Sequence, residues 1–207
     1  MAALPVNNPQ PRLPPEICER IIDHVDPSPW HGSRSTLLKC ALVCRGWYAM
    51  SRAVLFKDPM LFTRKEAMAC AKSLTKIPLL GARVRSLQIG TLRSTRMTSP
   101  ELASILVMLA GKPPNLAELS LLQVSFEQCS MRNLAFWSLH EFSHVTSLEL
   151  FGVTLPSASP FFQVVCSFPR LQLLRCEGLH WSEPRSMAPL PERHRMPLTT
   201  VTSLQYD

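Results

Sequence analysis

Glycine is scarce in this sequence, with 7 residues among 207, whereas proline is abundant, with 19. The sequence contains no Gly-x-x-x-x-Gly-Lys loop for phosphate and no Gly-x-Ser-x-Gly turn for a nucleophilic serine. Long apolar runs are also missing, and the longest, such as 105–110, are too short to cross a bilayer. These absences argue against a P-loop enzyme, a serine hydrolase and a membrane-spanning protein.

Paired cysteines are missing as well. The seven cysteines are odd in number and include no Cys-x-x-Cys pair, which favours reduced thiols packed as small hydrophobes. Cys44 lies in an apolar run and is expected to be inert. Residues 1–12 hold three prolines and no apolar segment, so we interpret them as a flexible tail rather than a signal peptide. These features predict a reducing compartment, the cytoplasm or the nucleus.

Acidic residues are fewer than basic ones, which gives a net charge of +7. The densest basic group has no aromatic side chains between its members to stack on bases: Arg83, Arg85, Arg93 and Arg96. We therefore interpret the basic residues as a solvated surface and expect neither a nucleic-acid nor a membrane partner. Hydrophobic residues make up 46% of the chain, which is enough for a packed core.

Residues 13–56 have the pattern of three short helices. Leu13-Pro14-Pro15-Glu16 suits a helix start, because proline has no N–H to leave unpaired there. The residues expected to be buried are Ile17, Ile21, Ile22 and Val25, then Leu37, Leu38, Ala41 and Leu42, then Trp47, Met50, Val54 and Leu55. Gly46 is expected to break the chain before the third helix. So small a module has more apolar side chains than its own packing needs, which predicts a partner.

These residues resemble the F-box. The resemblance rests on Leu13-Pro14-x-Glu16-Ile17, on Leu42-Val43-Cys44-Arg45-x-Trp47 and on the closing Leu55-Phe56, in that order. It implies a non-catalytic subunit that binds the Skp-type adaptor of a cullin-RING ubiquitin ligase. The adaptor-binding residues that it implies are Leu13, Pro14, Ile17, Ile21, Leu42, Val43 and Trp47. For Trp47, packing in the module's own core is the alternative role. The loop 26–35, which holds Trp30 and His31, is longer than usual and is reminiscent of fungal F-box proteins.

The rest of the chain contains a repeat. Five segments share alternating apolar positions, and their central leucines lie 26 to 32 residues apart: Leu87, Leu119, Leu148, Leu174 and Leu204. The alternation predicts strands with one buried face, and the stretches between them, such as 100–110, 131–142 and 161–168, predict helices. Residues 57–80 are interpreted as a linking helix, with its inward side formed by Ala67, Met68, Ala71 and Leu74.

Residues 81–207 resemble degenerate leucine-rich repeats, in which the position that often holds Asn is apolar here: Leu92, Val124, Val153 and Leu179. The resemblance implies an α+β chain in which an F-box precedes a short solenoid. An ordinary α/β domain with repeated strands is the alternative. The sequence stops within a strand-like segment, so we expect either a longer protein or a cap from another chain.

In leucine-rich repeats, the strand residues between the buried ones lie on the concave side. The candidate target-binding residues are therefore Gln88, Ser120, Leu122, Glu149, Phe151 and Arg175. Leu122 and Phe151 fall in one column and are apolar on a polar surface, which is typical of a contact site. Coverage of this pair by a neighbouring segment is the alternative.

One motif points to an enzyme instead. His140-Glu141-Phe142-Ser143-His144 fits His-Glu-x-x-His, whose histidines bind zinc and whose glutamate activates a water. A strand-like segment begins at Val145, however, so a helix would have to end there, which favours exposed polar residues at a helix end. We expect no cofactor and no metal. A zinc peptidase is the alternative function, and a repeat scaffold without a ligase is the third.

Overall fold

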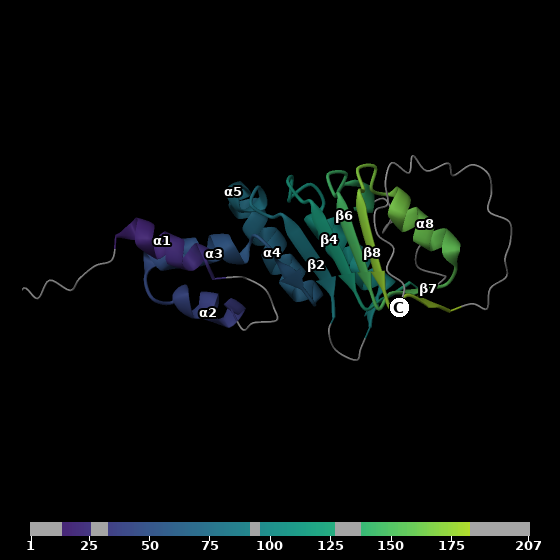
Figure 1. The fold of residues 1–207 in the computed structure, drawn as a ribbon, viewed down its shortest axis with the longest axis horizontal. Coiled ribbons are helices and arrows are strands. Elements are labelled where there is room, and N and C mark those ends of the chain that lie inside the picture. Colours follow the sequence, from purple (N-terminus) through teal and green to yellow (C-terminus); the bar gives the residue numbers. More distant parts are fainter. Residues whose placement is uncertain (1–13, 26–32, 92–95, 127–137, 183–207) are drawn as a thin grey trace, which may run out of the picture. The chain divides into compact units, whose positions relative to one another are not determined.

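The computed structural model describes residues 14–25, 33–91, 96–126 and 138–182 (Figure 1). The chain divides into two compact units, Met1–Leu55 and Phe56–Asp207. The described part of the first unit consists of helices, and the second contains parallel strands with connecting helices, so the chain is α+β as predicted. No helix in these four ranges is long and apolar enough to span a membrane.

The first unit contains α1 (Pro15–Asp23), α2 (Ser33–Cys40) and α3 (Arg45–Leu55), and α3 packs against both of the others. Helix α1 starts where the sequence predicts, since the Pro14 carbonyl accepts hydrogen bonds from the first free N–H groups of the helix. The core of this unit is small. It consists of Ile22, Leu37 and Val54, surrounded by Val25, Trp47, Met50 and Leu55.

Several predictions for the first unit are wrong. The predicted loop 26–35 extends too far, because α2 begins at Ser33. Leu38 and Leu42 are exposed, because α2 has only about two turns, presents Leu37 alone to the core, and gives way to a turn at 41–43. Gly46 lies inside α3. The break between α2 and α3 is therefore made by the turn before α3 and not by Gly46.

Helix α1 buries only part of the side predicted, since Ile22 is buried and Val25 packs against the core. Cys18 and Ile22 are buried, whereas Ile17 and Ile21 are exposed. These two pairs each span four residues and so occupy two separate stripes of the helix surface. The sequence predicts one broad apolar face, and only one of its stripes contacts α3.

The second unit is built on two parallel sheets. The first has five strands in the order β1 (Met60–Leu61), β2 (Ser86–Gly90), β4 (Glu118–Leu122), β6 (Ser147–Phe151) and β8 (Leu173–Glu177). The second has four short strands in the order β3 (Met97–Thr98), β5 (Val124–Ser125), β7 (Thr154–Leu155) and β9 (His180–Trp181). Figure 1 shows β2, β4, β6 and β8 side by side in sequence order.

Four of the repeated segments pair in the structure in the same register in which they align in the sequence. Leu87, Leu119, Leu148 and Leu174 are paired in one row across the sheet. Two residues further on, the next row is Ile89, Leu121, Leu150 and Cys176. All eight side chains are buried. The fifth segment, at 201–206, and Leu92 lie outside the described residues.

Helices α4 (Arg64–Lys76), α5 (Pro78–Gly81), α6 (Ser99–Leu109) and α8 (Ala158–Cys166) connect the strands. Helix α6 confirms the helix predicted at 100–110, and its four predicted inward residues are buried: Leu102, Ile105, Leu106 and Leu109. The helix predicted at 161–168 starts earlier and ends at Cys166. Most of the one predicted at 131–142 lies outside the described residues.

The linking helix predicted at 57–80 is only partly correct. Met60 and Leu61 form β1, which pairs with β2 and extends the sheet by one strand. The helix is interrupted at Ile77, because Pro78 cannot continue the hydrogen-bond pattern and opens α5. Met68 is exposed and Cys70 is buried, so the inward side of α4 is Ala67, Cys70, Ala71 and Leu74.

Candidate functional site

Five large aliphatic side chains, together with Tyr48, are exposed in the part of the first unit that the structure describes. The site is built from the five aliphatic ones. We call them the exposed apolar set, and they are Ile17, Ile21, Leu38, Leu42 and Val43. The most exposed are Leu42, at 86% of its full accessible area, and Val43, at 64%. Ile17 and Ile21 are one turn apart on α1 and so face the same way. A set of this size on three short helices is typical of a surface that a protein partner covers.

The exposed apolar set overlaps strongly with the adaptor-binding residues that the sequence suggests. Ile17, Ile21, Leu42 and Val43 belong to both, and Pro14 is also exposed. Leu13 lies outside the described residues. The sequence reasoning missed Leu38 as a surface residue by assigning it to the buried side of α2. The sequence offers no signal for this, because it places Leu38 and Leu42 together on the buried side, whereas α2 ends at Cys40.

Trp47 lies in a different environment from the exposed apolar set. It is half-buried and packs against the core formed by Ile22, Leu37 and Val54. Its indole therefore contributes to the internal packing of the first unit. A substitution at this position would change the stability of the three helices together with any contact to a partner, so it cannot separate the two roles.

The second unit presents a polar sheet surface on the side opposite to the buried leucine rows. Neighbouring residues on a strand point to opposite faces, so the residues between the buried rows share this surface. We call it the sheet face, and it comprises the six predicted target-binding residues: Gln88, Ser120, Leu122, Glu149, Phe151 and Arg175. The strand pairing brings all six onto four adjacent strands.

A hydrogen-bonded row crosses the sheet face. Ser120, Glu149 and Arg175 are neighbours in register on β4, β6 and β8. The Glu149 carboxylate accepts a hydrogen bond from the Ser120 hydroxyl at 2.9 Å and one from the Arg175 guanidinium at 3.0 Å. The ion pair is solvated, with side chains 63% and 39% exposed, so it adds little stability. The ion pair holds the Arg175 guanidinium in place. Residue spacing alone does not predict this network of hydrogen bonds.

An apolar pair lies beside this row. Leu122 and Phe151 are paired in register, as predicted, and the same row continues with Gly90 on one side and Glu177 on the other. Phe151 is 37% exposed, and Leu122 is half-buried. Within the described residues, the sheet face therefore combines an accessible aromatic ring with an adjacent carboxylate and guanidinium.

The His-Glu-x-x-His segment does not have the geometry of a zinc site on a helix. Residues 138–140 are helical, and Glu141 to His144 form a turn. The two histidines would share a side only on a continuous helix. Both are exposed. Among the residues that the structure describes, no group of three or more His, Cys, Asp or Glu side chains is arranged to hold a metal ion.

The described thiols range from buried to exposed, with Cys18 buried in the first unit and Cys40 half-buried. Cys70 and Cys176 are buried in the core of the second unit, and burial raises the pKa of the Cys176 thiol to about 11. Cys44 and Cys166 are exposed. The prediction that Cys44 is protected within an apolar helix is wrong, because Cys44 lies between α2 and α3 and not in a helix.

Comparison with known families assigns the first unit. Residues 10–61 match the F-box-like family, and this range covers the described parts of all three helices, the exposed apolar set and β1. No curated protein matches the chain. The range exceeds the predicted 13–56 at both ends. Residues 10–61 of this chain therefore form an F-box-like domain.

Proposed function

We propose that the chain is a substrate-recognition subunit of an SCF-type cullin-RING ubiquitin ligase. F-box-like domains bind Skp-type adaptors in cullin complexes, and the chain contains such a domain at residues 10–61. The observation that carries the proposal is the exposed apolar set within this domain. An adaptor that covers these five side chains removes apolar surface from water, which is the main favourable term in protein association.

The comparison of buried with exposed apolar side chains in the first unit supports the binding of a partner protein. Among its described residues, the buried core cluster consists of three side chains, whereas five large aliphatic side chains remain exposed. Full burial of one such side chain contributes roughly 1.5 to 3 kcal/mol. Several of them together can exceed the cost of lost translational and rotational freedom on association, which is about 4 to 15 kcal/mol.

The second part of the proposal is that the sheet face binds the target protein through its accessible members. Ser120 is buried, at 5% of its full accessible area, and therefore offers no direct contact to a target. The parallel strands in register resemble a short leucine-rich-repeat array, whose open sheet surface suits a protein ligand. Phe151 would be the central apolar anchor, and the Glu149–Arg175 pair would lie at the polar rim.

Catalysis in this proposal needs no reactive residue of the chain itself. The F-box-like domain holds the ligase, and the sheet face holds the target. Tethering then raises the effective concentration of target lysines beside the ubiquitin-loaded enzyme. The proposal thus assigns a binding function to both units.

Copurification with a Skp-type adaptor tests the first part. Leu42→Asp places a charge at the most exposed member of the apolar set without touching the core, so the variant keeps its fold. We expect the native chain to form a one-to-one complex, and the variant to bind at least about 30-fold more weakly, as for a central interface residue.

Leu79→Asp is the matched control, because Leu79 is 78% exposed and lies in the second unit on α5. It should bind the adaptor like the native chain. A native chain that is folded and does not bind the adaptor would refute the ligase assignment and favour a repeat scaffold. Equal loss in both variants would show that the F-box-like domain is not the contact.

The sheet face is tested by target capture after proteasome inhibition. Proteins bound by the chain in cells are quantified by mass spectrometry for the native chain, for Leu122→Ser with Phe151→Ser, and for Val107→Ser as control. Val107 is an exposed apolar residue on α6. We expect the double variant alone to lose a specific subset of proteins while keeping the Skp-type adaptor. Unchanged capture would exclude this face as the target-binding surface.

A further inference from the structure

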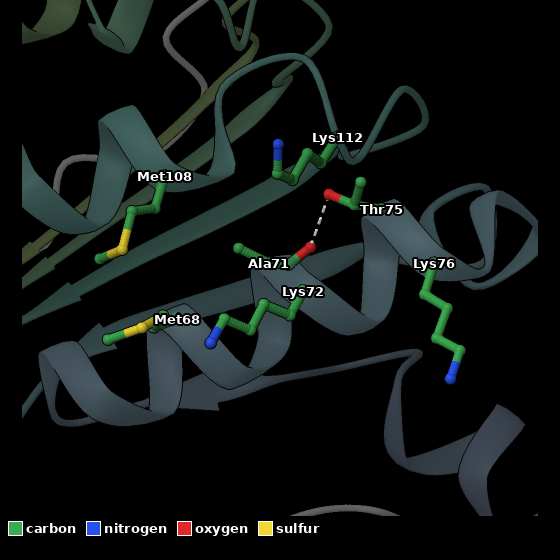
Figure 2. Close-up of a pocket in the computed structure, with 7 residues that line it drawn as sticks. All are labelled: Met68, Ala71, Lys72, Thr75, Lys76, Met108 and Lys112. Carbon is green, nitrogen blue, oxygen red and sulfur yellow. Dashed lines mark hydrogen bonds between the residues drawn. The ribbon is translucent and has the colours of Figure 1, made fainter.

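A groove of about 380 Å³ lies between α4 and α6 in the second unit (Figure 2). Its lining includes Met68 and Ala71 from α4 and Met108 from α6, with Lys72, Lys76 and Lys112 around them. The opposite sides of these helices contribute to the core beneath the sheet. The groove thus lies on the helical side of the unit, away from the sheet face.

The lining of the groove is apolar between charged edges. Met68 is exposed, and Met108 is half-buried, so both thioethers are accessible. Figure 2 shows that the Thr75 hydroxyl is turned onto the Ala71 carbonyl, to which it donates a hydrogen bond of 2.9 Å. Because this hydroxyl is occupied within the helix, the methionine side chains are the main contact surface that the lining offers. Methionine is flexible and polarisable, which suits the binding of apolar side chains of varied shape.

Three lysines contribute to the edges of this apolar lining, and Figure 2 shows the Lys76 ammonium turned away from the two methionines. Lys72 and Lys76 are one turn apart on α4, and Lys112 follows α6. None of the three lysines forms an ion pair with a carboxylate among the residues that the structure describes. Their mutual repulsion is relieved by an anionic ligand, and the net charge of +7 attracts one.

We propose that this groove binds an acidic peptide segment of a protein partner. One apolar side chain of the peptide would contact Met68 and Met108, and its carboxylates would pair with Lys72 and Lys112. A narrow groove between two helices suits an amphipathic segment with a single apolar side. This binding function is additional to the adaptor and target surfaces proposed above and does not depend on them.

Composition favours a separate partner over another segment of this chain. The segments outside the described residues are 1–13, 26–32, 92–95, 127–137 and 183–207, and none has more than one acidic side chain in excess of its basic ones. A second copy of the chain also carries +7 and would be repelled. The lining residues include no aromatic side chain to stack on a nucleic-acid base.

The test uses two fluorescein-labelled peptides of about twelve residues, long enough for three helical turns. One combines Glu, Asp and Ala with two leucines four positions apart, and the other replaces Glu and Asp by Gln and Asn. Binding is followed by anisotropy and by the methyl signals of ¹³C-methionine, assigned with Met68→Leu and Met108→Leu. We expect the acidic peptide alone to bind and to shift these two of the nine methionine signals.

Charge reversal provides the matched comparison. Lys72→Glu with Lys112→Glu should weaken binding of the acidic peptide at least about ten-fold, because attraction becomes repulsion. Lys57→Glu with Lys65→Glu makes the same change in charge at exposed lysines outside the groove and should have little effect. Equal binding of both peptides, or equal loss in both double variants, would overturn the proposal.

Two further probes separate the other anionic partners. Vesicles of phosphatidylcholine with phosphatidylserine and a single-stranded oligonucleotide are titrated under the same conditions. Shifts of the Met68 and Met108 signals by either probe, without shifts by the acidic peptide, would identify a membrane or nucleic-acid site and refute the peptide assignment. Absence of any shift with all the probes would equally refute it.

Discussion

At the scale of single residues, Gly90 and Gly111 differ in how much a side chain at each position would destabilise the fold. Gly90 has φ +141°, and a Cβ there would lie 1.9 Å from the carbonyl oxygen of Leu122. Gly111 has φ +68°, and a Cβ there would meet nothing within 4 Å. Both conformations disfavour side chains, but only Gly90 also faces a backbone atom that cannot move without disturbing the β2–β4 pairing.

Gly90→Ala is therefore expected to lower the free energy of unfolding by about 2 to 4 kcal/mol, since strain and a backbone clash add. Gly111→Ala should lower it by only about 1 kcal/mol, from the backbone conformation alone. Urea unfolding followed by circular dichroism measures both values. Equal values for the two variants would show that the backbone contact at Leu122 does not matter.

Thiol reactivity is a second consequence at this scale. The pKa of Cys176 is about 11, so its thiolate fraction at pH 8 is roughly 100-fold lower than for an ordinary cysteine. We expect iodoacetamide at pH 8 to label Cys44 and Cys166 quickly and Cys176 only after denaturation. Peptide mass spectrometry at timed intervals gives the rates. Labelling of Cys176 as fast as Cys166 in the native protein would contradict its burial.

At the scale of elements, a reciprocal cap fixes the start of α4. The Thr63 hydroxyl accepts a hydrogen bond from the Glu66 N–H at 3.2 Å, and the Glu66 carboxylate accepts one from the Thr63 N–H at 3.1 Å. At the start of α6, the Thr98 N–H and the Thr98 hydroxyl both donate to the Glu101 carboxylate at 2.9 Å. These short signals define helix starts that the apolar pattern locates only approximately.

Removal of the α4 cap should lower the free energy of unfolding by about the contribution of one hydrogen bond. We expect Thr63→Ala to reduce the free energy of unfolding by about 1 kcal/mol and Thr63→Ser to retain most of it. Thr63→Ala should also speed amide exchange in the first turn of α4. The control is Thr75→Ala, which removes a hydroxyl that donates only to the Ala71 carbonyl within the same helix and leaves the first turn intact. If Thr63→Ala were no more destabilising than Thr75→Ala, the cap would have no net effect.

The bends between the long and short strands explain how apolar residues can follow them. Gln123, Gly152 and Gly178 have positive φ values of 49°, 61° and 61°. The N–H groups of Gln123 and Gly152 donate to carbonyls of the next strand at 2.7 and 2.8 Å. Backbone groups therefore satisfy these bends directly, so Val124 and Val153 can be buried without an Asn side chain.

At the scale of the whole molecule, the two units differ in the size of their cores. The first relies on Ile22, Leu37 and Val54, whereas the core of the second extends from Leu61 to Cys176. Small modules bury a lower fraction of their surface and are less stable. Two units with cores of different size are expected to unfold locally with different free energies, although they belong to one chain.

Hydrogen exchange should therefore be faster for the amides of α1 and α3 than for those of β4 and β6. We expect a Skp-type adaptor to slow exchange in α1–α3 and to leave the second unit almost unchanged. Mass spectrometry of peptic fragments resolves the two regions. Equal protection in both regions without the adaptor would contradict the difference in core size.

The sequence by itself determined the α+β class, the three helices and the row alignment of the strands. Alternating leucines fix both the buried face and the register, because a slip by one residue would expose every one of them. The helical pattern of the sequence placed Ile17, Ile21 and Leu42 inward, and the structure exposes them, as it does Val43. That these four bind an adaptor, as the F-box resemblance implies, stays a prediction. Apolar periodicity cannot say which stripe of a short helix meets its neighbour, so Leu38 and Met68 were assigned inward and are exposed.

Only the tertiary structure decided features that depend on distant segments. β1 is too short to show a period and exists because β2 offers it hydrogen-bond partners. The Glu149 network needs three strands, and the groove needs two helices brought together by the core beneath them. Local pattern specifies what each segment can bury, whereas contacts across the chain decide which side chains stay accessible to a partner.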